Sequence, residues 1–260
     1  MSASKFLIEL QARGNYCFTT AEAKALLDSS DVAVLSVLRR LQKKGDIAMP
    51  QRGFYVIVPP EYRSLGCLPA EQFIPMLMEH LGNAYYAGLL SAAQYHGAAH
   101  HRPQMFQVFT ARNKWPIECG KIRVEFVARK NVREIPTVTT NTLRGLLRLS
   151  SPEATAFDLV GYPRHAGGLD NVATVLAELA EKLDPAEIVR ISGLSPLSWA
   201  QRLGYLMDLV GMSEKVDELA AYIAGKGTVF SSLVTSQPVH GADKNQRWRL
   251  LINSTIEAEL

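Results

Sequence analysis

The chain has 260 residues, of which 47% are hydrophobic and 20% charged, so it can build a core and is not a disordered protein. It contains no apolar run of about eighteen residues, so we expect no membrane-spanning helix, and its start lacks the apolar segment of a signal peptide. Cys17, Cys67 and Cys119 show no CxxC spacing. This pattern excludes a disulfide scaffold and a cysteine-built zinc site, and it favours a reducing, cytoplasmic location.

The net charge of +3 is distributed unevenly. Residues 1–60 carry eight basic and five acidic side chains, and residues 100–149 carry ten basic and three acidic ones. Residues 150–260 are acidic, with nine basic and fourteen acidic side chains. Two basic regions favour contact with a polyanion, and solvated surface charge is the alternative.

Hydrophobic periodicity in residues 1–60 predicts three helices followed by a β-hairpin. We expect the helices at 4–13, 19–27 and 31–44, and the strands at 47–49 and 54–58. Thr19 and Glu22 have the spacing of a capping box, in which each residue satisfies a free backbone N–H of the other. Pro59-Pro60 predicts a linker after this unit.

Residues 61–260 predict a mixed α/β domain that is helical from residue 150 onward. Upstream of 150 we expect helices at 73–82 and 85–97, strands at 106–110, 121–127 and 138–140, and a turn at 114–120. Downstream we expect helices over 154–160, 169–183 and 199–210 and another after residue 184, with caps at Ser150–Glu153, Asp184 and Ser195. The predicted fold class is therefore α+β and mostly helical, with a winged helix-turn-helix at 1–60 and a larger domain at 61–260.

The helix expected at 31–44 is amphipathic. At 100° per residue its apolar side chains, Val34, Val37, Leu38 and Leu41, share one face, and its polar side chains lie opposite. In a helix-turn-helix the second helix enters the major groove, where arginine can bind guanine or phosphate. The N-terminus of the helix can bind a phosphate, and the hairpin becomes a wing. The predicted DNA-binding residues are Ser29, Ser30, Ser36, Arg39, Arg40, Lys43, Lys44, Gln51 and Arg52. A solvated cationic face is the alternative.

The second basic region centres on the strand expected at 121–127. Alternation places Ile122, Val124 and Phe126 on a buried face and Lys121 and Arg123 on the outer face. We interpret the region as a positively charged surface that binds an acidic partner or lengthens the DNA footprint; solubility and protection of a strand edge are the alternative. Its predicted residues are Arg112, Lys114, Lys121, Arg123, Arg129, Lys130 and Arg133.

Motifs for catalysis are absent from the sequence. His96, His100 and His101 have a spacing that can bind a metal on a helix, but a polar helix end is the simpler interpretation. The sequence contains no P-loop, no nucleophile elbow and no paired carboxylates suited to two-metal chemistry. Carboxylates after residue 150 occur singly on helices, where we expect them to be solvated. We expect no enzyme activity, no metal and no cofactor.

Several strings, in their order along the chain, resemble the AbiEi-type antitoxins of abortive-infection toxin–antitoxin systems. They are Tyr85–Ala93 with Tyr95–Gly97, Ser151–Val160, Gly167–Val172 and Gln201–Leu206, which follow the winged helix-turn-helix. The resemblance implies an N-terminal domain that represses its own operon and a C-terminal domain that counteracts a nucleotidyltransferase-like toxin. With that role, the second basic region becomes the predicted surface for antitoxic activity. It also implies a type IV system for phage resistance, in which antitoxin and toxin need no stable complex.

Two other functions remain as alternatives. One is a winged-helix transcriptional regulator whose larger domain senses a small ligand, and the other is an enzyme with an appended DNA-binding domain. The absence of catalytic motifs counts against the enzyme. The expected DNA partner is a double-stranded operator with repeats, since one winged helix reads too few base pairs for a genome-wide search.

Overall fold

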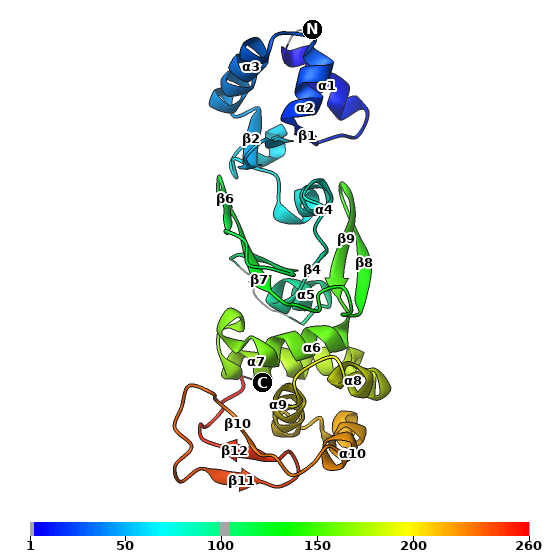
Figure 1. Cartoon of the computed structure of the whole chain (residues 1–260), viewed down its shortest axis with the longest axis vertical. Helices are drawn as coiled ribbons and strands as arrows, with labels where there is room; N and C mark the ends of the chain where they lie inside the picture. Colours follow the sequence, from blue (N-terminus) through cyan, green and yellow to red (C-terminus); the bar gives the residue numbers. More distant parts are fainter. Residues whose placement is uncertain (1–2, 99–103, 260) are drawn as a thin grey trace. The chain divides into compact units, whose positions relative to one another are not determined.

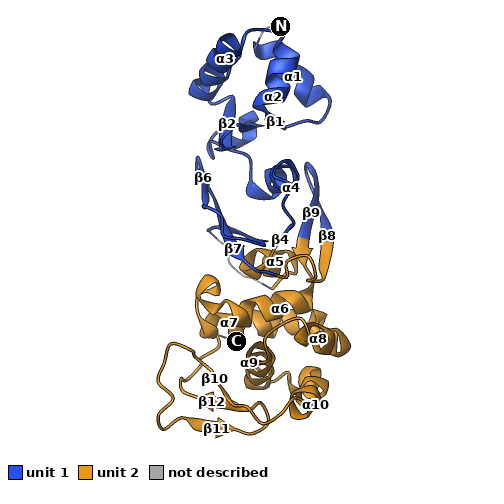
Figure 2. Cartoon of the chain, in the orientation of Figure 1, with its two compact units in different colours: residues 1–86, 104–130, 139–148 blue, residues 87–103, 131–138, 149–260 orange. Residues whose placement is uncertain are grey.

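The computed structural model describes residues 3–98 and 104–259. The fold is α+β with helices predominating, as predicted. The chain forms two compact units (Figure 2). Unit 1 comprises residues 1–86, 104–130 and 139–148, and unit 2 comprises residues 87–103, 131–138 and 149–260.

Unit 1 begins with the element order of a winged helix-turn-helix (Figure 1). The elements are α1 (Ala3–Ala12), β1 (Cys17–Thr19), α2 (Thr20–Leu27), α3 (Asp31–Lys44), β2 (Ile47–Gln51) and β3 (Phe54–Ile57). The strands form an antiparallel sheet in the order β1-β3-β2. The three helices and the hairpin are confirmed. Strand β1 was not predicted, because three residues are too few to show an alternating pattern.

Local side-chain chemistry sets the ends of α2 and α3. The capping box is present: the backbone N–H of Glu22 donates to Oγ1 of Thr19 at 3.2 Å, and the backbone N–H of Thr19 donates to the Glu22 carboxylate at 2.6 Å. Ser30 caps α3 by accepting from the N–H of Ala33 at 3.4 Å. Gly45 ends α3 with a φ of +71°, a left-handed conformation that only glycine adopts freely.

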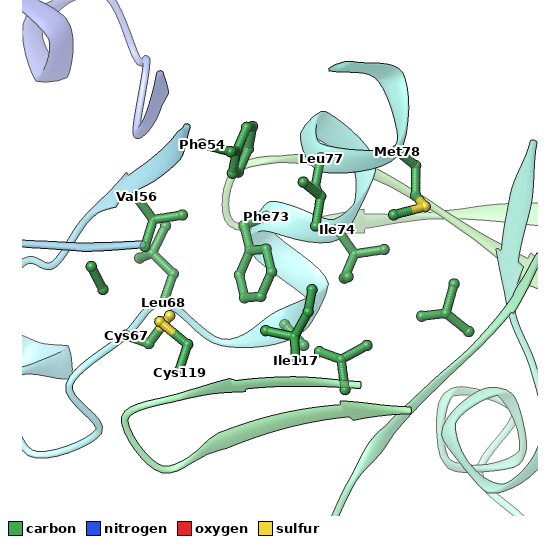
Figure 3. Close-up of a cluster of buried hydrophobic side chains, with 14 of the residues drawn as sticks. Phe54, Val56, Cys67, Leu68, Phe73, Ile74, Leu77, Met78, Ile117 and Cys119 are labelled. Atoms are coloured by element: carbon green, nitrogen blue, oxygen red, sulfur yellow. The ribbon is translucent and has the colours of Figure 1, made fainter. Parts of the chain in front are cut away.

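Strand β3 is buried on both faces. Its Tyr55 and Ile57 belong to the core formed with α1, α2 and α3. Its Phe54 and Val56 belong to a second core, which also contains Phe73 of α4 (Ala70–His80) (Figure 3). A strand in an exposed hairpin would have one solvated face, so the second core makes the winged helix part of a larger hydrophobic unit.

A six-stranded sheet has the order β6-β7-β5-β4-β9-β8. Its strands are β4 (Tyr85–Ala87), β5 (Phe106–Thr110), β6 (Ile117–Cys119), β7 (Ile122–Ala128), β8 (Thr137–Thr142) and β9 (Gly145–Ser150). Strand β4 comes before residues 99–103 in the sequence, and the other five strands come after them. Strands β5 and β7 pair in parallel, and β6 pairs with β7 antiparallel. The predicted strands at 106–110, 121–127 and 138–140 are therefore confirmed.

Two expectations for this region are wrong. The helix expected at 85–97 is strand β4 followed by the shorter α5 (Leu89–Tyr95), because Tyr86 is fully buried in the sheet and its ring stacks on Phe109, with the ring centroids 4.9 Å apart. The turn expected at 114–120 contains strand β6. Strand β9 was not predicted. The partner of β4 is distant in sequence, since Ala87 pairs with Leu149, and β6 has only three residues, too few to show an alternating pattern.

Cys67 and Cys119 lie together where two backbone segments meet in unit 1 (Figure 3). The N–H of Lys121 donates to the carbonyl oxygen of Leu65 at 2.7 Å. A Cβ at Gly120 would overlap that carbonyl oxygen, so glycine is needed for this approach. The two thiols are hydrogen-bonded to each other, and this contact, together with burial, raises the pKa of Cys67.

Unit 2 is mainly helical, as predicted. After α5 its helices are α6 (Pro152–Gly161), α7 (Leu169–Leu179), α8 (Pro185–Ser192), α9 (Leu197–Leu209) and α10 (Asp217–Gly225), with short 3₁₀ segments between them. A small sheet in the order β10-β12-β11 follows, formed by β10 (Ser231–Ser232), β11 (Asp243–Asn245) and β12 (Leu250–Ile252). The sheet was not predicted, since each of its strands is very short.

Several side chains near the starts of these helices differ from expectation. The N-cap of α6 is Ser151, which accepts from the N–H of Ala154, and Ser150 lies in β9. Asp184 caps α8 as expected, whereas the N-cap residue of α9 is Pro196 and not Ser195. Glu153 is buried rather than solvated: its carboxylate accepts from the Asp184 N–H at 3.1 Å.

Trp248 fixes the C-terminal segment against α9. Its indole Nε1–H donates to the Asp208 carboxylate at 2.6 Å, and the ring is fully buried. A Cβ at Gly204 of α9 would overlap the six-membered ring of Trp248. Gly204 therefore allows the indole to lie against the helix backbone.

We expect Gly204→Ala to lower the free energy of unfolding by about 1–3 kcal/mol, because the added methyl group must displace Trp248 from a packed site. The matched control is Gly225→Ala in α10, where an added Cβ meets no atom and alanine should raise stability by about 0.5 kcal/mol. Urea unfolding followed by circular dichroism measures both. Equal stability of Gly204→Ala and the wild type would contradict the close packing.

Candidate nucleic-acid interface

Helix α3 presents a polar face and a buried face, as predicted. Val34, Leu38 and Leu41 are buried in the core of the winged helix, and Val37 is half-buried against it. The predicted polar residues of this helix are all exposed: Ser36, Arg39, Arg40, Lys43 and Lys44. The fold therefore displays the cationic residues of α3 together on one element.

Apolar residues extend this face toward the start of α3. Val32 is 76% exposed and Leu35 39% exposed, and neither was among the predicted DNA-binding residues. We define the α3 stripe as Val32, Leu35, Ser36, Arg39 and Lys43, whose spacings of three and four residues place them along one line of the helix. The exposure of these two apolar residues could have been predicted from the sequence, because at 100° per residue both lie away from the buried face of the helix.

Hydroxyl groups near the start of α3 already have partners. Ser30 caps the helix, the Ser29 hydroxyl donates to the Leu27 carbonyl at 3.2 Å, and the Ser36 hydroxyl donates to the Val32 carbonyl at 2.8 Å. Asp31 forms an ion pair with Lys24 at 2.7 Å in the first turn. Ser29 and Ser30 are exposed, and a phosphate contact there would have to accommodate the nearby carboxylate.

The wing tip is held against the rest of the winged helix. The turn between β2 and β3 contains Arg52 and Gly53, and Gly53 has a φ of +81°. The carbonyl oxygen of Gly53 accepts from the N–H of Thr20 at 2.9 Å, which ties the tip to the start of α2. Gln51 and Arg52 are both exposed. The structure therefore presents both predicted wing residues from a fixed turn.

Most of the second basic region is exposed in unit 1. Val124 and Phe126 are buried and Ile122 is half-buried, as the predicted alternation requires. The exposed or half-buried basic side chains of unit 1 in this region, which we call the basic set, are Arg112, Lys114, Lys121, Arg123 and Lys130. The sequence interpretation overlooked Trp115, a tryptophan within this basic sequence that is 91% exposed.

Two predicted members do not belong to the basic set. Arg129 is 4% exposed, so its assignment to an exposed surface is wrong. Its guanidinium donates to the Tyr86 hydroxyl at 3.2 Å. Its backbone N–H donates to the Thr110 carbonyl at 2.8 Å, because the backbone still runs beside β5 just after β7 ends. Arg133 is exposed but lies in unit 2.

The buried charges of unit 2 connect secondary-structure elements. The Arg202 guanidinium donates to the Leu233 carbonyl at 2.8 Å and to the Val160 carbonyl at 3.5 Å. Burial lowers the pKa of Arg202. Asp158 on α6 is fully buried, contrary to the expectation that these carboxylates are solvated. The hydrogen bonds of Arg202 therefore join α6, α9 and the C-terminal segment.

An open hollow of about 590 Å³ lies between α9 and the C-terminal segment of unit 2. Tyr205, Leu209, His240, Asp243 and Asn253 are among its lining residues. The Asn253 side chain is committed to the backbone, since its amide donates to the Val234 and Gln237 carbonyls.

The described residues contain no group of three or more histidine, cysteine or acidic side chains that could hold a metal. His96 is buried, and its Nε2 lies 2.8 Å from the Ser150 carbonyl oxygen. Burial lowers the pKa of His96. His100 and His101 lie outside the described residues. No helix within residues 3–98 and 104–259 is long and apolar enough to cross a membrane.

Two family models match the chain, and both describe AbiEi antitoxins. Residues 5–58 match the family model described as a transcriptional regulator, AbiEi antitoxin, and residues 86–209 match the AbiEi antitoxin C-terminal domain. A crystal structure of the RV2827C protein from Mycobacterium tuberculosis has a TM-score of 0.66. Its sequence is 17% identical over 95% of this chain and 90% of that chain, a likeness that shows the fold alone. No curated protein matches the chain.

The two family matches lie in the order that the sequence strings predicted, one on the winged helix and the other running from β4 to the end of α9. The chain belongs to the AbiEi-type antitoxins.

Proposed function

We propose that this chain is the antitoxin of a type IV toxin–antitoxin pair, which counteracts a nucleotidyltransferase-like toxin and represses its own operon. Its family gives it the coarser roles of antitoxin and DNA-binding transcriptional regulator. We assign operator binding to residues 1–60 and antitoxin activity to residues 61–260, and we place both in the cytoplasm. The observation that carries the regulatory role is the exposed α3 stripe beside a wing that is fixed at its tip.

Operator binding follows from the order of side chains along α3. A recognition helix contacts base edges chiefly through its N-terminal residues. Val32 and Leu35 would meet thymine methyl groups, which are apolar and project into the major groove. Arg39, Arg40, Lys43 and Lys44 would bind guanine or phosphate oxygens, and Gln51 and Arg52 of the wing would contact the flanking backbone.

A repeated operator follows from the small footprint of one winged helix. A single module reads only a few base pairs, which is too little to distinguish one site in a genome. Two copies of the protein on adjacent repeats would multiply the specificity. We propose that they associate on the DNA and are monomers in free solution.

We expect Arg40→Ala combined with Arg52→Ala to weaken operator binding and to reduce its salt dependence. Six phosphate contacts, five from Arg39, Arg40, Lys43, Lys44 and Arg52 and one from a basic residue of the larger domain, give a log–log salt slope of about −5. Loss of two contacts gives a slope of about −3.6. Mobility shifts with the upstream region of the chain's own gene, at several salt concentrations, measure both quantities. Lys226→Ala with Lys244→Ala removes the same charge from exposed positions of unit 2 and should leave binding unchanged. Unchanged affinity and slope in the Arg40 and Arg52 variant would contradict the assignment.

Antitoxin activity is assigned to the basic set. Lys121, Arg123 and Lys130 flank or lie on β7, whose apolar face is buried, so the strand is a rigid base for them. These cations would bind the toxin's acidic substrate or an RNA. A longer DNA footprint is the competing role.

We expect Lys121→Ala, Arg123→Ala and Lys130→Ala together to abolish rescue from the toxin while operator affinity stays near wild type. Expression from a foreign promoter separates rescue from autoregulation. The Lys226 and Lys244 double variant is the control for loss of positive charge. If the triple variant rescues cells but binds the operator weakly, the basic set extends the DNA footprint. Wild-type rescue together with wild-type affinity in a folded protein would exclude both roles.

The hollow in unit 2 favours one alternative, a winged-helix regulator that senses a small ligand. Its 590 Å³ volume falls in the range of small-molecule sites. The neighbouring gene distinguishes the two functions, because an adjacent nucleotidyltransferase-like reading frame favours the antitoxin and a metabolic operon favours the sensor.

A further inference from the structure

Trp115 is the most exposed large apolar side chain within the described residues, at 91%. It lies on the segment 111–116, which joins β5 to β6 in unit 1. Isolated exposed apolar residues are common on protein surfaces. An almost fully solvated indole in a sequence of basic residues has a more specific use, because an aromatic ring beside cations is the usual way to bind a nucleobase and its phosphate.

The segment that carries Trp115 is anchored at both ends. Before it, the Thr110 hydroxyl donates to the Arg112 carbonyl at 2.8 Å, and the Thr110 carbonyl accepts from the Arg129 N–H at 2.8 Å. After it, Ile117 is buried in the core that contains Phe73 and Leu77 (Figure 3). Pro116 restricts the backbone of Trp115 to extended conformations. The indole is therefore presented by a short connection between two fixed strands.

Charge around this segment is positive. Arg112 and Lys114 precede Trp115 on the same connection, and Lys121 and Arg123 follow on the β6–β7 hairpin. Glu118 and Glu125 are the nearby acidic residues in sequence. Glu118 stands opposite Arg123 in the strand register, and the Glu125 carboxylate accepts from the Gln107 side chain at 3.2 Å. The cations beside Trp115 are thus suited to bind the phosphates on either side of a base.

We propose that Trp115 stacks on an unpaired base of a single-stranded nucleic acid, with Arg112 and Lys114 on the adjacent phosphates. An unpaired base is required because the faces of the bases in a duplex are covered by their neighbours, whereas every unstacked base offers a π-face. This single-strand site is distinct from the α3 stripe. It deepens the proposed role of the basic set and rests on that role for its biological purpose, but its binding can be measured without the toxin or the operator.

Tryptophan fluorescence tests the site directly. The other two tryptophans differ from Trp115, since Trp248 is fully buried and Trp199 is half-buried. We expect ten-residue oligo(U) or oligo(dT) to quench the emission of the full chain in a saturable manner. The two oligonucleotides distinguish RNA from DNA as the better ligand. Trp115→Ala should remove this quenching and weaken binding about 10- to 100-fold, as expected for one stacked base.

Conservative and matched variants separate stacking from general damage. Trp115→Phe should keep most of the affinity, measured by the anisotropy of a labelled oligonucleotide, because it retains an aromatic face. Leu143→Ala changes another highly exposed apolar residue of unit 1 and should bind like the wild type. Operator affinity and the circular dichroism spectrum of Trp115→Ala should equal those of the wild type.

Three results would overturn the site. They are the absence of single-strand binding at micromolar concentration, equal affinity of Trp115→Ala and the wild type, and competition by a blunt duplex as effective as that by the single strand. If the first of these results came with quenching by the toxin, Trp115 would be a protein-docking residue instead. Loss of operator binding with intact single-strand binding would refute the regulatory proposal and leave this site standing.

Discussion

The burial of β3 on both faces is the constraint on which the rest of unit 1 depends. Tyr55 and Ile57 belong to the core formed with α1, α2 and α3. Phe54 and Val56 belong to the second core, which contains residues of α4. Removing either core would expose one apolar face of the strand to water. At about 25 cal/mol per Å² of apolar surface, that exposure would cost several kcal/mol for side chains of this size. The winged helix is therefore stabilised both by its own core and by the second core, which it shares with α4.

This arrangement explains how a small motif can display a rigid recognition surface. The core fixes α3 through Val34, Leu38 and Leu41, which leaves the α3 stripe exposed. The hydrogen bond from Thr20 to Gly53 fixes the wing tip relative to α2. A surface whose backbone is held before binding loses less conformational entropy when it binds. The same reasoning applies to Trp115, which two fixed strands present.

The sequence predicted best those features whose causes are local. The limits of α3 agree with the structure because Ser30 and Gly45 act on their own neighbours. Strand β6 was missed because three residues show no alternating pattern, and β1 and β4 were missed because their pairing partners lie far along the chain. Arg129 was misplaced for the same reason, since the Tyr86 hydroxyl that it binds is 43 residues away. Val32 and Leu35 could have been identified by helical phase alone, but Trp115 needed the structure to show its exposure.

The central claim is that α3 reads DNA in the major groove, and removal of single methyl groups tests it most directly. Each thymine of the operator is replaced in turn by uracil, which removes only the C5 methyl group, and affinities are compared for the wild type and Val32→Ala. The account predicts that certain replacements weaken binding by the wild type about fourfold, the value of one buried methyl group, and that Val32→Ala is insensitive to at least one of them. Equal sensitivity of both proteins at every thymine, or no sensitivity at any, would contradict the account.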